Sequence, residues 1–311
     1  MSLLCISLFG KFDVRRGQQT LTALDAHKIQ ELFCYLLLYR DRCHPRETLA
    51  DLLWGNSSTA QSKRYLRKAL WQLQAALDAP TEPHDGRVLL VESDWVQLNP
   101  EAELWLDVAE FEGTWNLVQG VPGGELDSRR VQTLQGAVDL YRGDLLEGWY
   151  QDWCLYERER LLHMYLAMLD KLMDYCEVHR QCEIGLAYGT IILRYDRARE
   201  RTHRRLMRLY YLARNRTAAL RQYERCVAAL DEELDVRPAK RTVVLYEQIR
   251  ADQLDWPPLT VADAPVSSET LALPLLKVLD RLRQLHQDLV DIQRQVQQDI
   301  EALKLPLSRK D

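Results

Sequence analysis

One segment, Thr59 to Leu77, constrains the fold of this chain most, because its two sides differ in chemistry. Apolar residues recur in it at spacings of three and four, which gathers them on one side of a helix. Those residues are Leu66, Ala69, Leu70, Leu73 and Leu77. Arg64 and Lys68 fall on the opposite side, and the segment contains no acidic residue. We therefore predict a helix that packs by its apolar side and presents a cationic face to water.

A purely cationic face is not what helix stability requires, since pairs of opposite charge four residues apart stabilise a helix better. A helix that lies in a DNA groove does benefit from such a face, because the cations neutralise phosphates and contact guanine edges. The alternative interpretation is a solvated surface helix. The segments around it help to decide between the two.

Length, charge and cysteine content limit how this chain could bind DNA and in which cellular compartment we expect it. A chain of 311 residues suits two domains with a remainder, and its net charge of −5 excludes a uniformly basic nucleic-acid coat, so any DNA contact has to be local. The seven cysteines are odd in number and scattered, which indicates a reducing cytosol. The N-terminus lacks a cationic leader, and the longest apolar run, Leu32 to Tyr39, is too short to span a membrane. We expect a cytoplasmic protein without membrane contact.

The first hundred residues predict a small α+β domain. Alternating apolar residues and turn signals indicate short strands up to about residue 21, and helical periodicity follows at 28–39 and 45–54. The basic helix is third, and residues 88–98 are expected to form a β-hairpin. Sheet, three helices and hairpin in this order predict a winged helix for residues 1–100.

Residues 101–252 predict an all-α domain. Leu104-Trp105-Leu106 is expected to open its first helix, and the later helices have the lengths and short connections of a tetratricopeptide-like (TPR-like) repeat array. Residues 253–274, with Trp256-Pro257-Pro258, are expected to be a linker.

A heptad repeat follows at residues 275–305 and predicts a coiled-coil helix. Its core positions are Leu275, Val278, Leu282, Leu285, Leu289, Ile292 and Val296. We expect a homo-oligomer, with a dimer favoured, formed through this helix, whereas docking on the helical domain or on another protein is the alternative.

Taken together, these segments predict a mainly α fold class, with the N-terminal α+β winged helix as its mixed part.

Several motifs resemble one known family. Leu8-Phe9-Gly10 and Leu66-Arg67-Lys68-Ala69-Leu70 resemble the N-terminal domain of the Streptomyces antibiotic regulatory protein (SARP) family, which is a winged helix of the response-regulator type. Tyr141-Arg-Gly-Asp-Leu-Leu and Ala218-Ala219-Leu220-x-x-Tyr223 resemble the bacterial transcriptional activator domain (BTAD) that follows it in SARP proteins. The motifs cover most of the chain and occur in the family's order.

The resemblance implies that the third helix enters the major groove of DNA and that the hairpin is the wing. The residues it implies as DNA contacts are Gln61, Ser62, Lys63, Arg64, Tyr65, Arg67 and Lys68, with Arg87 as a phosphate contact beside the wing. The wing tip, Glu92-Ser93-Asp94, departs from this pattern, because phosphates repel its two carboxylates. Trp71 lies on the polar flank of the same helix, and we expect it at an interdomain contact rather than on DNA.

Residues 194–225 hold eleven arginines against three acidic residues. One interpretation is a solvated convex face whose arginine stems cover apolar surface. The other is a docking site for an acidic partner, or an extra contact with the DNA backbone. The candidate partner-binding residues are Arg197, Arg201, Arg204, Arg205 and Arg208.

No phosphate loop, dinucleotide fingerprint, zinc-protease motif or nucleophile elbow occurs in the sequence, so we predict no catalytic residue and no cofactor. Cys176, His179 and Cys182 have metal-like spacing but no identifiable fourth ligand, and we expect them to be structural. The leading hypothesis is a bacterial, non-enzymatic, sequence-specific transcriptional activator whose partners are double-stranded DNA and, by resemblance, RNA polymerase. A protein-interaction scaffold that has lost DNA reading is the main alternative, and a small-ligand receptor on the concave helical surface is a third.

Overall fold

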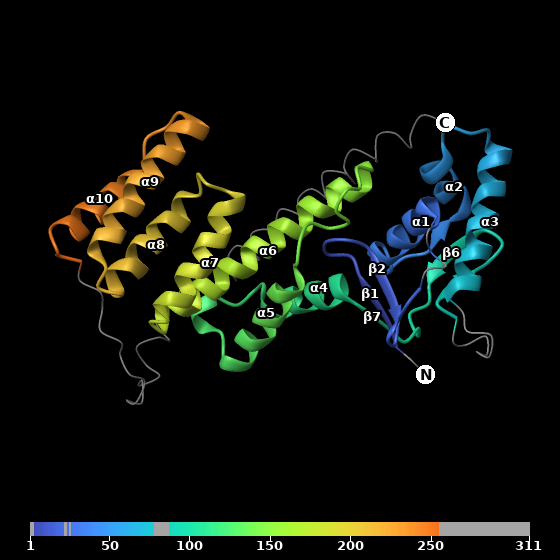
Figure 1. Cartoon of the computed structure of the whole chain (residues 1–311), viewed down its shortest axis with the longest axis horizontal. Helices are drawn as coiled ribbons and strands as arrows, with labels where there is room; N and C mark the ends of the chain where they lie inside the picture. The colour runs from blue at the N-terminus through green and yellow to red at the C-terminus, as the bar shows by residue number, and fades with distance from the viewer. Residues whose placement is uncertain (1–2, 22–23, 25, 78–86, 255–311) are drawn as a thin grey trace, which may run out of the picture. The chain divides into compact units, whose positions relative to one another are not determined.

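The computed structural model describes residues 3–21, 24, 26–77 and 87–254. Residues up to Leu254 form one compact unit. The described part is mainly helical, with small sheets near the N-terminal end, as Figure 1 shows. This confirms the predicted class in outline. The predicted coiled coil at 275–305, and all but the first two residues of the predicted linker, lie outside the described residues.

The first sheet has four strands in the order β3-β2-β1-β7. Strands β1 (Leu4–Ser7), β2 (Asp13–Arg16) and β3 (Gln19–Thr20) are antiparallel neighbours, and β7 (Leu104–Leu106) runs parallel to β1. The register pairs Ile6 with Val14 on one side and with Leu106 on the other. The prediction that Leu104 opens a helix was wrong, because these residues pair with β1 before helix α4 begins.

Three helices and a second sheet complete the N-terminal region. Helices α1 (His27–Leu38), α2 (Arg46–Trp54) and α3 (Thr59–Leu77) agree with the predicted segments. Strands β4 (His44–Pro45), β5 (Leu89–Val91) and β6 (Trp95–Leu98) form a sheet in the order β4-β6-β5, in which β5 and β6 are the expected hairpin. Helix α3 packs against α1 and α2.

The remaining helices pack in succession along the chain, in a TPR-like arrangement (Figure 1). They are α4 (Asp107–Val118), the short η3 (Gly123–Glu125), α5 (Ser128–Leu140), α6 (Asp152–Val178), α7 (Cys182–Tyr195), α8 (Glu200–Leu212), α9 (Arg216–Leu234) and α10 (Lys240–Arg250). No helix of the described residues is both long enough and apolar enough to cross a membrane.

Buried polar contacts join the N-terminal region to these helices. The carboxylate of Asp107, at the start of α4, accepts hydrogen bonds from the backbone N–H groups of Leu8 at 2.8 Å and Phe9 at 3.0 Å. Glu112 on α4 binds Arg40 and Arg160, each at 2.5 Å. One hydrophobic cluster also runs through both regions. The helical array is therefore joined to the first sheet of the N-terminal region by hydrogen bonds and by a shared hydrophobic cluster.

Candidate nucleic-acid interface

Helix α3 is held by the side that the sequence predicted. Leu66, Leu70 and Leu73 are buried. Ser62 is buried as well, and its hydroxyl donates to the carbonyl oxygens of Trp54, at 2.9 Å, and Ser58, at 3.2 Å. The prediction of Ser62 as a DNA contact needs correction, because its hydroxyl anchors the start of α3 to the end of α2.

The other predicted α3 residues are exposed. Lys63 forms an ion pair with Glu47 of α2 at 2.5 Å, which lowers the pKa of that carboxyl. The ring of Tyr65 lies 6.3 Å from that of Trp54, measured between centroids. The remaining exposed candidates are Gln61, Arg64, Arg67 and Lys68. In the part of the chain that the structure describes, Arg64, Arg67 and Lys68 have no carboxylate within ion-pairing distance, so their charge faces solvent.

Trp71 is also on this face. Its spacing of seven from Arg64 and three from Lys68 places it on their side of the helix. Its side chain is 69% exposed, so the expectation that it fills an interdomain contact was wrong for the described residues. A large aromatic ring therefore stands among the cations of α3.

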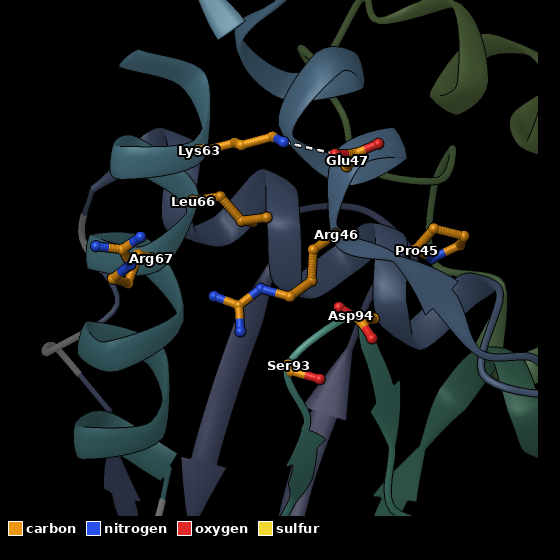
Figure 2. Close-up of a pocket in the computed structure, with 8 residues that line it drawn as sticks. All are labelled: Pro45, Arg46, Glu47, Lys63, Leu66, Arg67, Ser93 and Asp94. Carbon is orange, nitrogen blue, oxygen red and sulfur yellow. Dashed lines mark hydrogen bonds and ion pairs between the residues drawn. The ribbon is translucent and has the colours of Figure 1, made fainter. Parts of the chain in front are cut away.

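A cleft of about 550 Å³ lies beside this face. It is lined by Pro45, Arg46, Glu47, Lys63, Leu66, Arg67, Ser93 and Asp94. Figure 2 shows α3 on one side of it, the start of α2 on another, and the turn of the β5–β6 hairpin below. The cleft thus has basic side chains from two helices and two acidic residues, Glu47 from α2 and Asp94 from the hairpin turn.

The hairpin turn is fastened to the start of α2. The backbone N–H of Arg46 donates to the carbonyl of Asp94 at 2.9 Å, and its guanidinium donates to the carbonyl of Glu92 at 2.8 Å. The side chains of Glu92 and Asp94 remain exposed. Arg87 lies at the other end of the hairpin, just before β5, and its carbonyl accepts a hydrogen bond from Asn99 at 2.7 Å. The structure therefore places Arg87 at the base of the hairpin, away from its turn.

The arginine-rich segment of α8 is largely an internal network. Arg205 is 3% exposed and binds Asp170 at 2.7 Å, Glu177 at 3.1 Å, and Asp174, all on α6. Arg204 is 7% exposed and donates to Thr242 at 3.0 Å. The prediction that these two arginines bind a partner needs correction, because their guanidinium groups are used to join α8 to α6 and α10.

The other three candidates are partly neutralised. Arg201 pairs with Asp170 at 3.4 Å, Arg208 with Glu177 at 3.4 Å, and Arg197 with Glu232 at 3.0 Å. A sequence signal for this network existed, because the acidic residues of α6 recur at spacings of four and three and so share one side of a helix.

The cysteine and histidine residues with metal-like spacing contact other groups. Burial raises the pKa of the Cys176 thiol to about 11. The ring of His179 stacks on the ring of Tyr175, and its Nδ1 atom lies 3.0 Å from the backbone carbonyl oxygen of Tyr175. Within the described residues, no cluster of three or more His, Cys, Asp or Glu side chains is placed to hold a metal ion.

Residues 106–250 match the family model of the bacterial transcriptional activator domain. This confirms the resemblance drawn from the motifs of the helical region. No protein of the curated collection matches the chain. Among solved structures, the chain is similar to Mycobacterium tuberculosis EmbR, solved in complex with a low-affinity phosphopeptide. The two share 19% sequence identity with a TM-score of 0.62, over 90% of this chain and 72% of that one, a likeness of fold.

Proposed function

Since residues 106–250 match the family model of the bacterial transcriptional activator domain, we propose that the chain is a SARP-like transcriptional regulator and that it binds double-stranded DNA through the exposed face of α3. In this proposal α1, α2, α3 and the β5–β6 hairpin act as a winged helix, with α3 as the helix that enters the major groove. The observation that carries it is the group of three cations on α3 without a carboxylate partner among the described residues.

The chemistry of the α3 face suits base and phosphate contacts. Arginine can bind the O6 and N7 atoms of guanine in a bidentate manner, and lysine can neutralise a phosphate. Arg64, Arg67 and Lys68 are assigned these roles, and the amide of Gln61 suits the N6 and N7 atoms of adenine. The exposed ring of Trp71 offers an apolar contact for a thymine methyl group.

The hairpin turn contributes less to affinity in this proposal. The carboxylates of Glu92 and Asp94 are repelled by phosphates, and the two hydrogen bonds from Arg46 fasten the turn beside α2. The turn then stays shallow, while Arg87 at the base of the hairpin reaches the DNA backbone.

We further propose that the protein acts in the bacterial cytoplasm, as an activator that contacts RNA polymerase.

Removal of two of these cations, Arg64 and Lys68, tests the proposed contact between α3 and DNA. In Arg64→Ala/Lys68→Ala, operator affinity is expected to fall by about thirtyfold or more, because each of the two contacts is worth about 1–3 kcal/mol. The slope of log affinity against log salt is expected to decrease in magnitude by about one, since Lys68 is the phosphate contact of the two and each such contact contributes about 0.9.

The matched control is Arg129→Ala/Arg130→Ala, which removes the same charge from exposed positions on α5. Titration of fluorescent operator DNA at several salt concentrations measures both quantities. Equal affinity of the wild type and the α3 variant would remove the proposed recognition face.

The acidic turn favours one second candidate, a protein-interaction scaffold that no longer reads DNA. Such a scaffold would retain its protein partner after nuclease treatment and would carry no bound genomic fragments. A pull-down with and without nuclease therefore separates the two functions.

A further inference from the structure

A second hollow, remote in sequence from α3, lies among three consecutive helices of the activator domain. Its volume is about 370 Å³, and its walls come from α7, α8 and α9, which follow one another in Figure 1. Much of the lining is apolar: Leu193, Leu206, Tyr210, Ala228 and Ala229. The two alanines bring only methyl groups to the wall formed by α9.

A buried pair of polar side chains lies at the polar side of this groove. The Nε2 atom of His203 lies 2.8 Å from the carbonyl oxygen of Arg197, which can only accept, so Nε2 carries the proton. Burial lowers the pKa of His203 and keeps its ring neutral, so Nδ1 accepts from the amide nitrogen of Gln222 at 2.8 Å. The amide oxygen of Gln222 is thereby turned toward the Arg225 guanidinium, which donates to it at 3.5 Å.

The charge of the groove is positive. Arg194, Arg197 and Arg225 line it, and no acidic residue does. Arg197 is occupied by Glu232 at 3.0 Å and Glu233 at 3.7 Å. Within the part of the chain that the structure covers, Arg194 and Arg225 have no ion pair with a carboxylate. Two guanidinium groups therefore stand beside an apolar hollow with their charge uncompensated.

We propose that this groove binds a small organic acid that has an apolar body and one carboxylate. The carboxylate lies on Arg194 and Arg225, whose planar donor groups match its geometry, and the apolar body lies on Leu193, Leu206 and Tyr210. A small molecule fits better than a protein segment, because a volume of about 370 Å³ falls in the range of small-molecule pockets. The activator domain then carries a ligand site of its own.

Calorimetric titration of the full chain with octanoate tests this site, with octanol and octylammonium as probes of the same length and different charge. Octanoate is expected to bind at least about tenfold more tightly than either, since one charge-assisted contact is worth about 1.5–3 kcal/mol. Arg194→Gln/Arg225→Gln is expected to lose this preference. Ala228→Leu, at an exposed position of the wall, is expected to weaken all binding by filling the groove.

Arg129→Gln/Arg130→Gln is the control for charge, and thermal unfolding without ligand confirms that each variant is folded. The site is excluded if octanoate does not bind, if octanol binds equally well, or if the Arg194/Arg225 variant binds octanoate like the wild type. Because the titration contains no DNA, its failure would leave the α3 interface untouched.

Discussion

Arginine side chains of this protein have different roles, depending on whether a carboxylate lies within ion-pairing distance. Arg205 is buried opposite three acidic residues of α6 that share one side of the helix, and it pairs with all three. Arg64 lies on a helix whose sequence contains no acid, and it is exposed. The same chemical group therefore holds helices together in one place and remains available to a partner in the other.

Loss of Arg205 is expected to be costly for stability. Arg205→Ala leaves Asp170 and the buried Glu177 with longer ion pairs, such as those to Arg201 and Arg208 at 3.4 Å each. The loss of the shorter pairs is expected to lower the free energy of unfolding by up to about 3–5 kcal/mol. Arg208→Ala removes a more exposed partner of Glu177 and is expected to cost about 1 kcal/mol or less. Denaturant unfolding of both variants measures the difference. An equal loss of unfolding free energy in the two variants would mean that Arg205 contributes no more to stability than the more exposed Arg208.

His203 gives the stability a pH dependence of known sign. Burial lowers its pKa, although Asp196 and Glu200 act in the opposite direction. The folded state therefore binds fewer protons than the unfolded state once the pH falls below the ordinary histidine pKa of about 6.5. This contribution is fully present above that pH, and it is lost as the pH falls, by at most about 1.4 kcal/mol per pH unit.

The variant His203→Gln has no titrating ring at this position. Its free energy of unfolding, measured between pH 8 and pH 5, is expected to decline less steeply than that of the wild type. His44, whose pKa is also lowered by burial, remains as a common background in both proteins. Identical slopes would show that the buried ring does not govern the acid response.

Among the helices and strands, the features that depend on local periodicity could be predicted. The apolar spacing of α3 fixes which side is buried, so Leu66 and Leu70 inside and Arg64 and Lys68 outside follow from the sequence alone. The order of strands, three helices and hairpin in the N-terminal region follows in the same way from strand and helix patterns.

Features that depend on distant partners could not be predicted. Ser62 is polar and lies at the start of α3, and only the carbonyl of Trp54 explains its burial. Leu104–Leu106 has no intrinsic signal that distinguishes the first turn of a helix from a strand, and its partner β1 lies about a hundred residues earlier. The apolar groove with Arg194 and Arg225 requires three helices to be brought together.

At the scale of the molecule, polar contacts between described residues connect the N-terminal and helical regions at several points. The Asp107 carboxylate accepts hydrogen bonds from the backbone N–H groups of Leu8 and Phe9, and the backbone N–H of Gly10 donates to the backbone carbonyl of Asp144 at 2.9 Å. These contacts join the sheet beneath the N-terminal helices to the activator domain.

Self-association through the heptad at residues 275–305 stays a prediction and has a direct test. Leu282→Asp/Leu289→Asp places charge at two predicted core positions and is expected to convert a dimer into a monomer. Gln287→Asp/Gln298→Asp adds the same charge at positions outside the predicted core. Light scattering coupled to size-exclusion chromatography measures the mass. A dimer that persists in the core variant would exclude this helix as the interface.

The proposed contact between α3 and DNA is tested most directly by sequencing the genomic fragments that the 311-residue chain retains. The wild type and Arg64→Ala/Lys68→Ala are each incubated with sheared genomic DNA from the source organism, and the bound fragments are recovered. We predict that the wild type enriches fragments with a shared sequence and that the variant does not. Retention of random fragments by the wild type, or of the same enriched set by the variant, would contradict DNA reading by α3.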